Sequence, residues 1–319
     1  MKSTLLTLLF ATILQPIAPV QADDLFVAVG YGGRRIISTD GLKWEITAEW
    51  AQPGGDDGNN LMSAVYAENK FVVVGGGGGG NSGDGHILTS TDGRTWKEVY
   101  KTMNRINPVV YGQGRVVVGA PQRKLLRSDD AETWHEGAQI DDKLCTHFRG
   151  GAFGNDRFVF VGNHGGGGGP HWVAVSPDGE SITHVRADLP GHGTIVFGAG
   201  KFLMLTSHSD ADLLTSTDGM QWDRVAVDGA AKLRWLVWTG REFLVEANKT
   251  IYRSADGDVW TKSEVVAPRG TVKWTDGTRF ITSSWPGKMG FSPDGKAWQD
   301  SPPLSANGIN RVVLGVRPE

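Results

Sequence analysis

The sequence Ser38-Thr39-Asp40-Gly41-Leu42-Lys43-Trp44 decides the fold, because its pattern, Ser-x-Asp-Gly-x-x-Trp, returns six more times along the chain. In the third copy Ala131 replaces the glycine, and in the fourth Ile182 replaces the tryptophan. The starts are 52, 38, 48, 40, 38 and 38 residues apart, close to the roughly 40–45 residues of a four-stranded propeller blade. The sequence therefore predicts seven copies of one structural unit, with further copies beginning at Ser90, Ser128, Ser176, Ser216, Ser254 and Ser292.

Two short strand-like segments precede the turn in every repeat after the first. The run Phe71-Val72-Val73-Val74 follows Val65-Tyr66, and Phe158-Val159-Phe160-Val161 follows Ala152-Phe153. β-Branched and aromatic runs bounded by Gly, Asn and Asp are typical of strands joined by hairpins. No segment has a helical period, so we expect an all-β chain that forms a seven-bladed β-propeller of four-stranded antiparallel blades.

The two ends of the chain predict how the ring closes. The first repeat begins at Leu25 with no innermost strand before it. The segment Asn310-Arg311-Val312-Val313-Leu314 resembles the innermost strand at residues 107–111. We therefore expect the N- and C-terminal strands to share one blade, which leaves no exposed strand edge.

Residues 1–22 have the features of a secretory signal peptide. Lys2 precedes an apolar stretch at residues 5–14, and Val20-Gln21-Ala22 supplies a small-residue cleavage site. The stretch is too short to span a bilayer, which takes about 20 apolar residues. We expect cleavage near Ala22, a secreted or periplasmic bacterial protein without membrane insertion, and a single propeller domain over residues 23–319.

The composition describes a globular protein of nearly balanced charge. Lys and Arg number 32 against 35 Asp and Glu, so the net charge is -3 and we expect no nucleic-acid partner. The single cysteine, Cys145, excludes an intrachain disulfide and a cysteine-based metal site. The glycine runs at 75–80 and 165–169 neither open a helix nor precede the Lys-Ser/Thr of a nucleotide-binding loop. We expect a monomer and assign neither a cofactor nor a metal site.

The seven turns resemble the Asp-box, or BNR, repeat of the sialidase-like β-propeller superfamily, over essentially the whole chain after residue 22. The resemblance implies that the boxes lie between the third and fourth strands of each blade, on the face away from an active site. Sialidases also carry a Phe/Tyr-Arg-Ile-Pro motif, whose nearest match here is Arg35-Ile36-Ile37, without proline. Seven-bladed relatives include plant-type photosystem II assembly factors and polysaccharide-degrading enzymes, so the resemblance leaves the function open.

Arginines gather where the inner strands begin, on the face opposite the boxes. Aligning the repeats on the aromatic residue that ends the inner strand places Arg149 and Arg234 in one register. Arginine is well suited to bidentate binding of carboxylate, sulfate or phosphate. The alternative is that these are solvated loop charges. We predict ligand-binding roles for these two residues and for three arginines near the same register, namely Arg105, Arg269 and Arg311.

A second set of loops on the same face carries histidines and aromatic residues. His164 and His208 lie six residues after the strand phenylalanine of consecutive blades, and Tyr31 lies five residues after its own. Histidine can act as a general base near neutral pH. These three residues are candidate catalytic groups, although loop histidines are also common as polar surface. His171 and Trp285, from the same loop set, are candidate ligand-binding residues.

Two functions fit these residues. In the first, the channel mouth binds an anionic carbohydrate, either without cleaving it or with cleavage by a glycoside hydrolase or polysaccharide lyase activity. In the second, a non-catalytic scaffold or assembly factor binds a protein partner on the same face. A narrow cleft in which Arg, His and carboxylates converge would favour the enzyme, and evenly distributed charge without a deep pocket would favour the scaffold.

Overall fold

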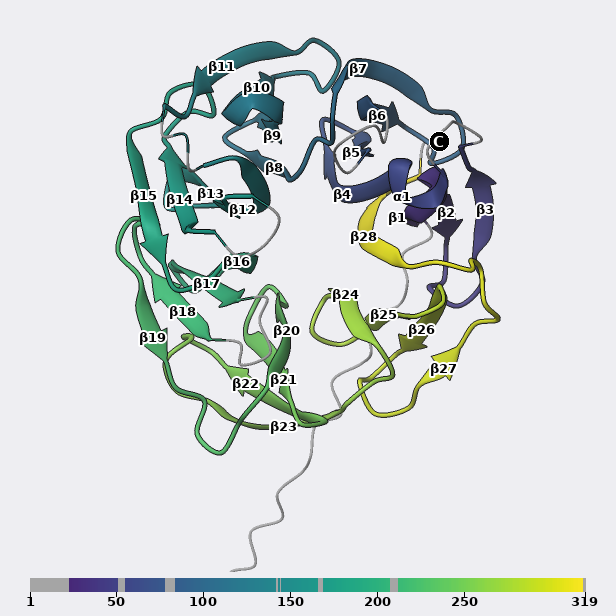
Figure 1. The fold of residues 1–319 in the computed structure, drawn as a ribbon. Coiled ribbons are helices and arrows are strands. Elements are labelled where there is room, and N and C mark those ends of the chain that lie inside the picture. Colours follow the sequence, from purple (N-terminus) through teal and green to yellow (C-terminus); the bar gives the residue numbers. More distant parts are fainter. Residues whose placement is uncertain are drawn as a thin grey trace, which may run out of the picture.

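The computed structural model describes residues 23–50, 55–77, 84–141, 143, 145–165, 169–206 and 212–317. Within these residues, seven four-stranded antiparallel sheets surround a central axis (Figure 1). The fold is the expected seven-bladed β-propeller. The expected signal peptide, residues 1–22, lies outside the described residues. No helix in the described ranges is both long enough and apolar enough to cross a membrane.

In each blade the first strand lies nearest the axis and the fourth lies at the rim (Figure 1). Blade 1 contains β28 (Ile309–Val316), β1 (Asp24–Gly30), β2 (Arg35–Ser38) and β3 (Glu45–Ala48). Blade 2 contains β4 (Asn60–Ala67), β5 (Lys70–Gly76), β6 (Asp84–Ser90) and β7 (Lys97–Met103). Blade 3 contains β8 (Val109–Gly112), β9 (Arg115–Ala120), β10 (Lys124–Ser128) and β11 (His135–Gln139).

The remaining four blades follow in chain order. Blade 4 contains β12 (His147–Gly154), β13 (Arg157–Asn163), β14 (His171–Ser176) and β15 (His184–Leu189). Blade 5 contains β16 (Gly193–Gly198), β17 (Lys201–Thr206), β18 (Leu213–Ser216) and β19 (Asp223–Val225). Blade 6 contains β20 (Leu233–Trp238), β21 (Phe243–Ala247), β22 (Thr250–Ser254) and β23 (Thr261–Val266). Blade 7 contains β24 (Thr271–Thr275), β25 (Phe280–Ser284), β26 (Lys288–Ser292) and β27 (Gln299–Asp300). In the described part of the chain, three single turns of helix lie between strands: η1 (Tyr31–Gly33), α1 (Gly55–Gly58) and η2 (Pro121–Arg123).

One turn geometry joins the third and fourth strands of every blade. In the first copy, Asp40 Oδ1 accepts the backbone N–H groups of Leu42 and Lys43, both at 2.8 Å. The Ser38 hydroxyl accepts the N–H of Gly41, also at 2.8 Å. These bonds satisfy turn amides that strand pairing leaves free, which explains why Ser and Asp are repeated. The same pair of amide bonds is made by Asp92, Asp130, Asp178, Asp218, Asp256 and Asp294.

The glycine and tryptophan of the turn hold it against the preceding blade. Gly41 has a φ of 75°, which disfavours other residues. A Cβ atom there would also lie only 2.7 Å from Cδ2 of Phe291 in blade 7. The indole N–H of Trp44 donates to the Gly41 carbonyl at 3.0 Å. The turn therefore joins neighbouring blades as well as neighbouring strands.

The hydrophobic core is divided among the interfaces between blades. Seven clusters of buried side chains are found among the described residues, one at each interface. Between blades 1 and 2, for example, Val27 and Val29 pack with Leu61, Phe71 and Val73. Both faces of every sheet are therefore apolar, as expected where sheets pack on each side.

The ring closes through blade 1, as the sequence predicts. The C-terminal strand β28 pairs antiparallel with β1, from Asp24 opposite Val316 to Gly30 opposite Ile309. The two ends of the chain thus supply adjacent strands of one sheet, and this pairing removes the edges that an open ring would expose.

Candidate functional site

Two connected pockets lie where the inner strands begin. The side pocket, of about 360 Å³, lies over blades 2, 3 and 4. The axial pocket, of about 300 Å³, is lined by inner-strand residues of five blades. They share Met62, Asn107 and Arg149, so Arg149 faces both. The described residues that line them include Arg105, His147, Arg149, His192 and Arg311 but neither Asp nor Glu.

β-Bulges place several of these side chains. In β12, Phe148 pairs with Gly162 and Gly150 pairs with Val161, so Arg149 is an extra residue in the ladder. A bulge re-aims a side chain away from the regular alternation of a strand, and bulges often lie next to functional sites. Bulges in three other inner strands leave one residue unpaired: Met62 in β4, Lys273 in β24 and Asn310 in β28. In β20 the pairing is interrupted at Arg234 and Trp235.

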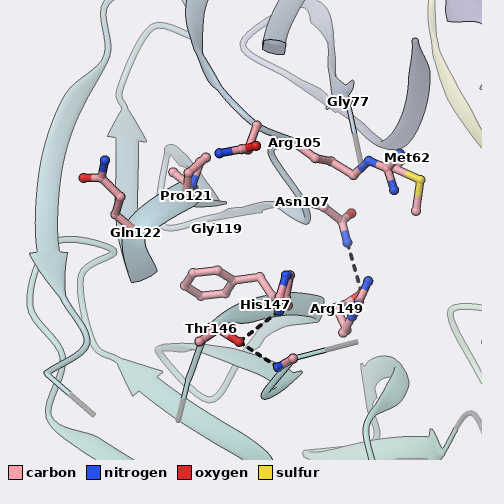
Figure 2. Close-up of a pocket in the computed structure, with 14 residues that line it drawn as sticks. Met62, Gly77, Arg105, Asn107, Gly119, Pro121, Gln122, Thr146, His147 and Arg149 are labelled. Atoms are coloured by element: carbon pink, nitrogen blue, oxygen red, sulfur yellow. Dashed lines mark hydrogen bonds between the residues drawn. The ribbon is translucent and has the colours of Figure 1, made fainter. Parts of the chain in front are cut away.

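Arg149 is held from two sides. Its Nε donates to Oδ1 of the buried Asn163 at 2.7 Å, and its carbonyl accepts from Asn107 Nδ2 at 3.3 Å (Figure 2). Burial and the neighbouring charge of Arg105 lower the pKa of Arg149. Arg105 itself, between β7 and β8, donates from Nε to the Gly76 carbonyl at 2.9 Å. The two arginines therefore lie close enough to repel one another.

His147 lines the side pocket next to Arg149, and His164 lies close to it without lining the pocket. His147 Nδ1 lies 2.9 Å from the Thr146 hydroxyl, which also accepts the N–H of Gly165 at 3.0 Å (Figure 2). Burial lowers the pKa of His147, and the charges of Arg149 and His164 lower it further. Nδ1 of His164 is buried with no hydrogen-bond partner among the described residues. The neutral form of His147 is therefore favoured beside the arginine.

Arg311 lines the axial pocket, and Lys273 of the neighbouring inner strand lies outside the lining but close enough to be affected by the charge of Arg311. Burial lowers the pKa of Arg311, and burial together with Arg311 lowers the pKa of Lys273 to about 8. His192 lines the same pocket, and its Nδ1 lies 2.9 Å from Nδ1 of His171. Asn310 is fixed by bonds from Nδ2 to Asn60 Oδ1 at 2.5 Å and to the Leu61 carbonyl at 2.7 Å.

Other predicted residues lie outside the two pockets. Arg234 pairs with Glu246 of β21 at 3.2 Å, and that carboxylate is only 1% exposed. Arg269 is 84% exposed and lies 4.0 Å from Asp300. His208 falls in residues 207–211, outside the described ranges.

Tyr31 and Trp285 lie together, beside Gly308. A Cβ atom at Gly308 would be 3.4 Å from the Tyr31 ring and 3.9 Å from the Trp285 ring. These two aromatic residues thus come from the loops of neighbouring blades 1 and 7. The structure separates them from His164, which lies in blade 4 and with which they were grouped as candidates from the sequence.

Sequence reasoning missed Lys273 and His147. Lys273 comes directly before Trp274, the residue on which the repeats are aligned, so the sequence indicates an ordinary strand residue there. The structure shows instead that Lys273 lies in a β-bulge, outside the regular strand pairing. His147 lies two residues before Arg149, and the cationic character of that segment was the signal available in the sequence.

The site is suited to binding anions. Five positive or protonatable side chains line the pockets. The pKa values of three of them, His147, Arg149 and Arg311, are lowered, which disfavours their charged forms. An acidic group would restore a favourable environment for these charges. In the described part of the chain, no three His, Cys, Asp or Glu residues are grouped so as to hold a metal ion.

Comparison with known proteins identifies the fold only. No protein-family model and no curated protein sequence matches the chain. It is similar to YCF48 from Cyanidioschyzon merolae (TM-score 0.53, 15% identity, 81% of this chain and 95% of YCF48). It is also similar to YCF48 bound to D1 peptide (TM-score 0.55, 14% identity, 92% of this chain and 89% of that one). A third similar structure is AztD from Citrobacter koseri (TM-score 0.54, 12% identity, 92% of this chain and 98% of AztD).

Proposed function

We propose that this protein is a non-catalytic scaffold or assembly factor that holds an anionic segment of a protein partner at the channel mouth. The observation that carries the proposal is the position of Arg149, which faces both pockets, is close enough to Arg105 to be repelled by it and meets no carboxylate in the described lining. Like charges held side by side in a recess disfavour one another's charged forms. Binding an anion would relieve that cost, so the site is prepared for an acidic ligand.

A peptide is favoured over a saccharide for two reasons. One structure of similar fold, YCF48, was solved with a D1 peptide bound. The described lining also lacks the two carboxyl groups that most glycoside hydrolases use as acid and as base or nucleophile. Apolar groups such as Met62, Pro121 and Phe148 line the side pocket as well and would accept peptide side chains. Under this proposal His164 lies near a binding wall and is not a general base.

Calorimetric titration with synthetic hexaglutamate, at low and at moderate salt, tests the proposal. We expect hexaglutamate to bind, hexaglutamine not to bind, and the affinity to fall with salt. The variant Arg149→Ala should weaken binding by about 1.5–3 kcal/mol, the usual value of a charge-assisted hydrogen bond. The control Arg94→Ala, which removes an exposed arginine from a turn on the opposite face, should bind like the wild type. Equal affinity in both variants would contradict the proposal.

An anionic saccharide remains the competing ligand, because its acid groups present the same chemistry to arginine. Polygalacturonate and heparin belong in the same titration. Binding of either one through Arg149, with no binding of hexaglutamate, would replace the peptide with a carbohydrate. Shortening of the saccharide during the titration would establish an enzyme, with His164 and Tyr31 the first residues to replace.

Two wider proposals rest on the sequence. Membership of the Asp-box propellers is supported by seven turns that share one pattern of hydrogen bonds. Secretion is supported by the signal-peptide features of residues 1–22. Mass spectrometry of the protein from periplasm and medium tests the second proposal. A mature N-terminus at Asp23 is expected, and an intact residue 1 in the cytoplasmic fraction alone would contradict it.

A further inference from the structure

Trp285 is an exposed indole on a firmly held turn. It lies between β25 and β26, and 69% of its surface is exposed to solvent. Ser284 and Lys288 pair across the turn, and the Gly287 carbonyl accepts the N–H of Leu304 at 3.1 Å. The exposure of Trp285 is therefore not that of a loosely attached loop. Large aromatic side chains held in this way are typical of binding surfaces.

Tyr31 lies beside Trp285, and the two rings flank Gly308. The backbone N–H of Tyr31 donates to the Gly308 carbonyl at 3.2 Å, which ties the backbone at Tyr31 to the segment that contains Gly308. Since a Cβ atom at Gly308 would lie within 4 Å of both rings, any larger residue there would occupy the space between them. We call Tyr31, Trp285 and Gly308 the aromatic platform.

The aromatic platform lies close along the chain to residues that line the axial pocket. Gly308 precedes β28, and Asn310 and Arg311 of that strand line the pocket. Arg311 is three positions after Gly308, a span of at most roughly 10 Å. An extended peptide advances about 3.3 Å per residue, so it covers this span with about three residues. A ligand whose acidic groups enter the pocket therefore passes close to the platform.

We infer that the aromatic platform binds an apolar or aromatic side chain of the same anionic segment, about three residues from the acidic side chains in the axial pocket. This inference rests on the proposed function. It adds a sequence rule to it, because the partner must carry both kinds of residue at a defined spacing. Charge selects the segment at the pocket, and the exposed indole selects the neighbouring side chain.

Blocked synthetic peptides test the spacing. The bare probes are Glu-Glu-Glu-Gly-Gly and Gly-Gly-Glu-Glu-Glu. The extended probes carry Phe after zero, two or six glycines, on either side of the acidic triplet. N-Acetylation and C-amidation remove the terminal charges. We expect the two-glycine spacing to bind the wild type about tenfold more tightly than the bare probe, in at least one of the two directions, and the other spacings to gain less.

The variant Trp285→Ala should abolish the gain from Phe while it binds the bare probes like the wild type. Trp285→Phe should keep part of the gain. Val259→Ala removes an exposed apolar side chain from a turn on the other face and should change nothing. An undiminished gain in Trp285→Ala, or a gain independent of spacing, would overturn the inference. The inference would also be overturned if Trp285→Ala weakened the binding of polygalacturonate alone, because the platform would then bind sugar.

The two proposals fail separately. If the bare probes bind and depend on Arg149, the proposed function stands whatever Trp285 does. If no acidic peptide binds in any variant, the proposed function fails first and the aromatic platform loses its partner.

Discussion

Lys273 of β24 and Arg311 of β28 repel one another on neighbouring inner strands of the propeller. Burial, and then the charge of Arg311, lower the pKa of Lys273 to about 8, from 10.5 for a free lysine. Arg311 lines the axial pocket, and burial lowers its pKa too. A stable fold has no need for two cations in this place. Arg311 shares the axial pocket with Arg149, which agrees with a site that is completed by an anion.

Replacing Lys273 with methionine should therefore stabilise the protein. Because the folded pKa lies below the unfolded one, the unfolded state binds more protons between about pH 8 and 10.5. The wild type should gain stability as the pH rises through this window and carry the full cost below it. At pH 7, Lys273→Met should raise the free energy of unfolding by about 1–3 kcal/mol. Urea unfolding at pH 7 and pH 10 measures this, and a destabilised variant would show that Lys273 has a structural role.

Anion binding should also depend on the protonation of Lys273. A bound carboxylate raises the pKa of a neighbouring lysine, so binding takes up a proton when the free lysine is neutral. Hexaglutamate should bind most tightly below about pH 8 and more weakly as the pH rises toward 10. Lys273→Arg keeps its charge throughout this range and should show a much smaller decline. An identical decline in the variant would assign the effect to another group.

The box turns should contribute to stability and not to binding. Trp222 donates its indole N–H to the Gly219 carbonyl at 3.0 Å and packs against the cluster between blades 4 and 5. Trp222→Ala should lower the free energy of unfolding by about 3 kcal/mol. The affinity for hexaglutamate should stay the same, since the turn faces away from the pockets. Weakened binding with an unchanged melting temperature would be incompatible with this assignment.

Truncation after Asn307 should prevent a stable ring. It removes β28, the partner of β1, and with it the pocket residues Asn310 and Arg311. The exposed edge of β1 would then be free to pair with other chains. Size-exclusion chromatography should show aggregates or no soluble protein. A monomer with near-native melting would mean that closure through blade 1 contributes little.

Most of the fold could be predicted from the sequence because its determinants are local. Each box depends on a serine, an aspartate and, in six of the seven copies, a glycine within four residues, so the motif alone specifies the turn. The shared blade could be predicted as well, because β28 repeats the pattern of the other inner strands. Strand register was less accessible, since pairing joins residues that the repeat pattern does not relate.

Sequence alignment of the repeats finds a pocket residue where the β-bulge falls at the same position of the inner strand. Arg149 and Asn310 each lie four residues before the inner-strand residue on which the repeats are aligned, and both lie in bulges. In blade 7 the bulge falls three residues later, at Lys273, where the alignment gives Gly270. Glu246 occupies a position that holds valine or leucine in several other blades, and only the structure shows that it pairs with Arg234.

The most direct test of the central claim is a crystal structure of the protein with hexaglutamate bound. The account predicts at least one glutamate carboxylate within hydrogen-bonding distance of the Arg149 guanidinium, with the peptide extending into the side pocket, the axial pocket or both. Peptide bound elsewhere on the propeller, with both pockets empty at a saturating concentration, would contradict the claim.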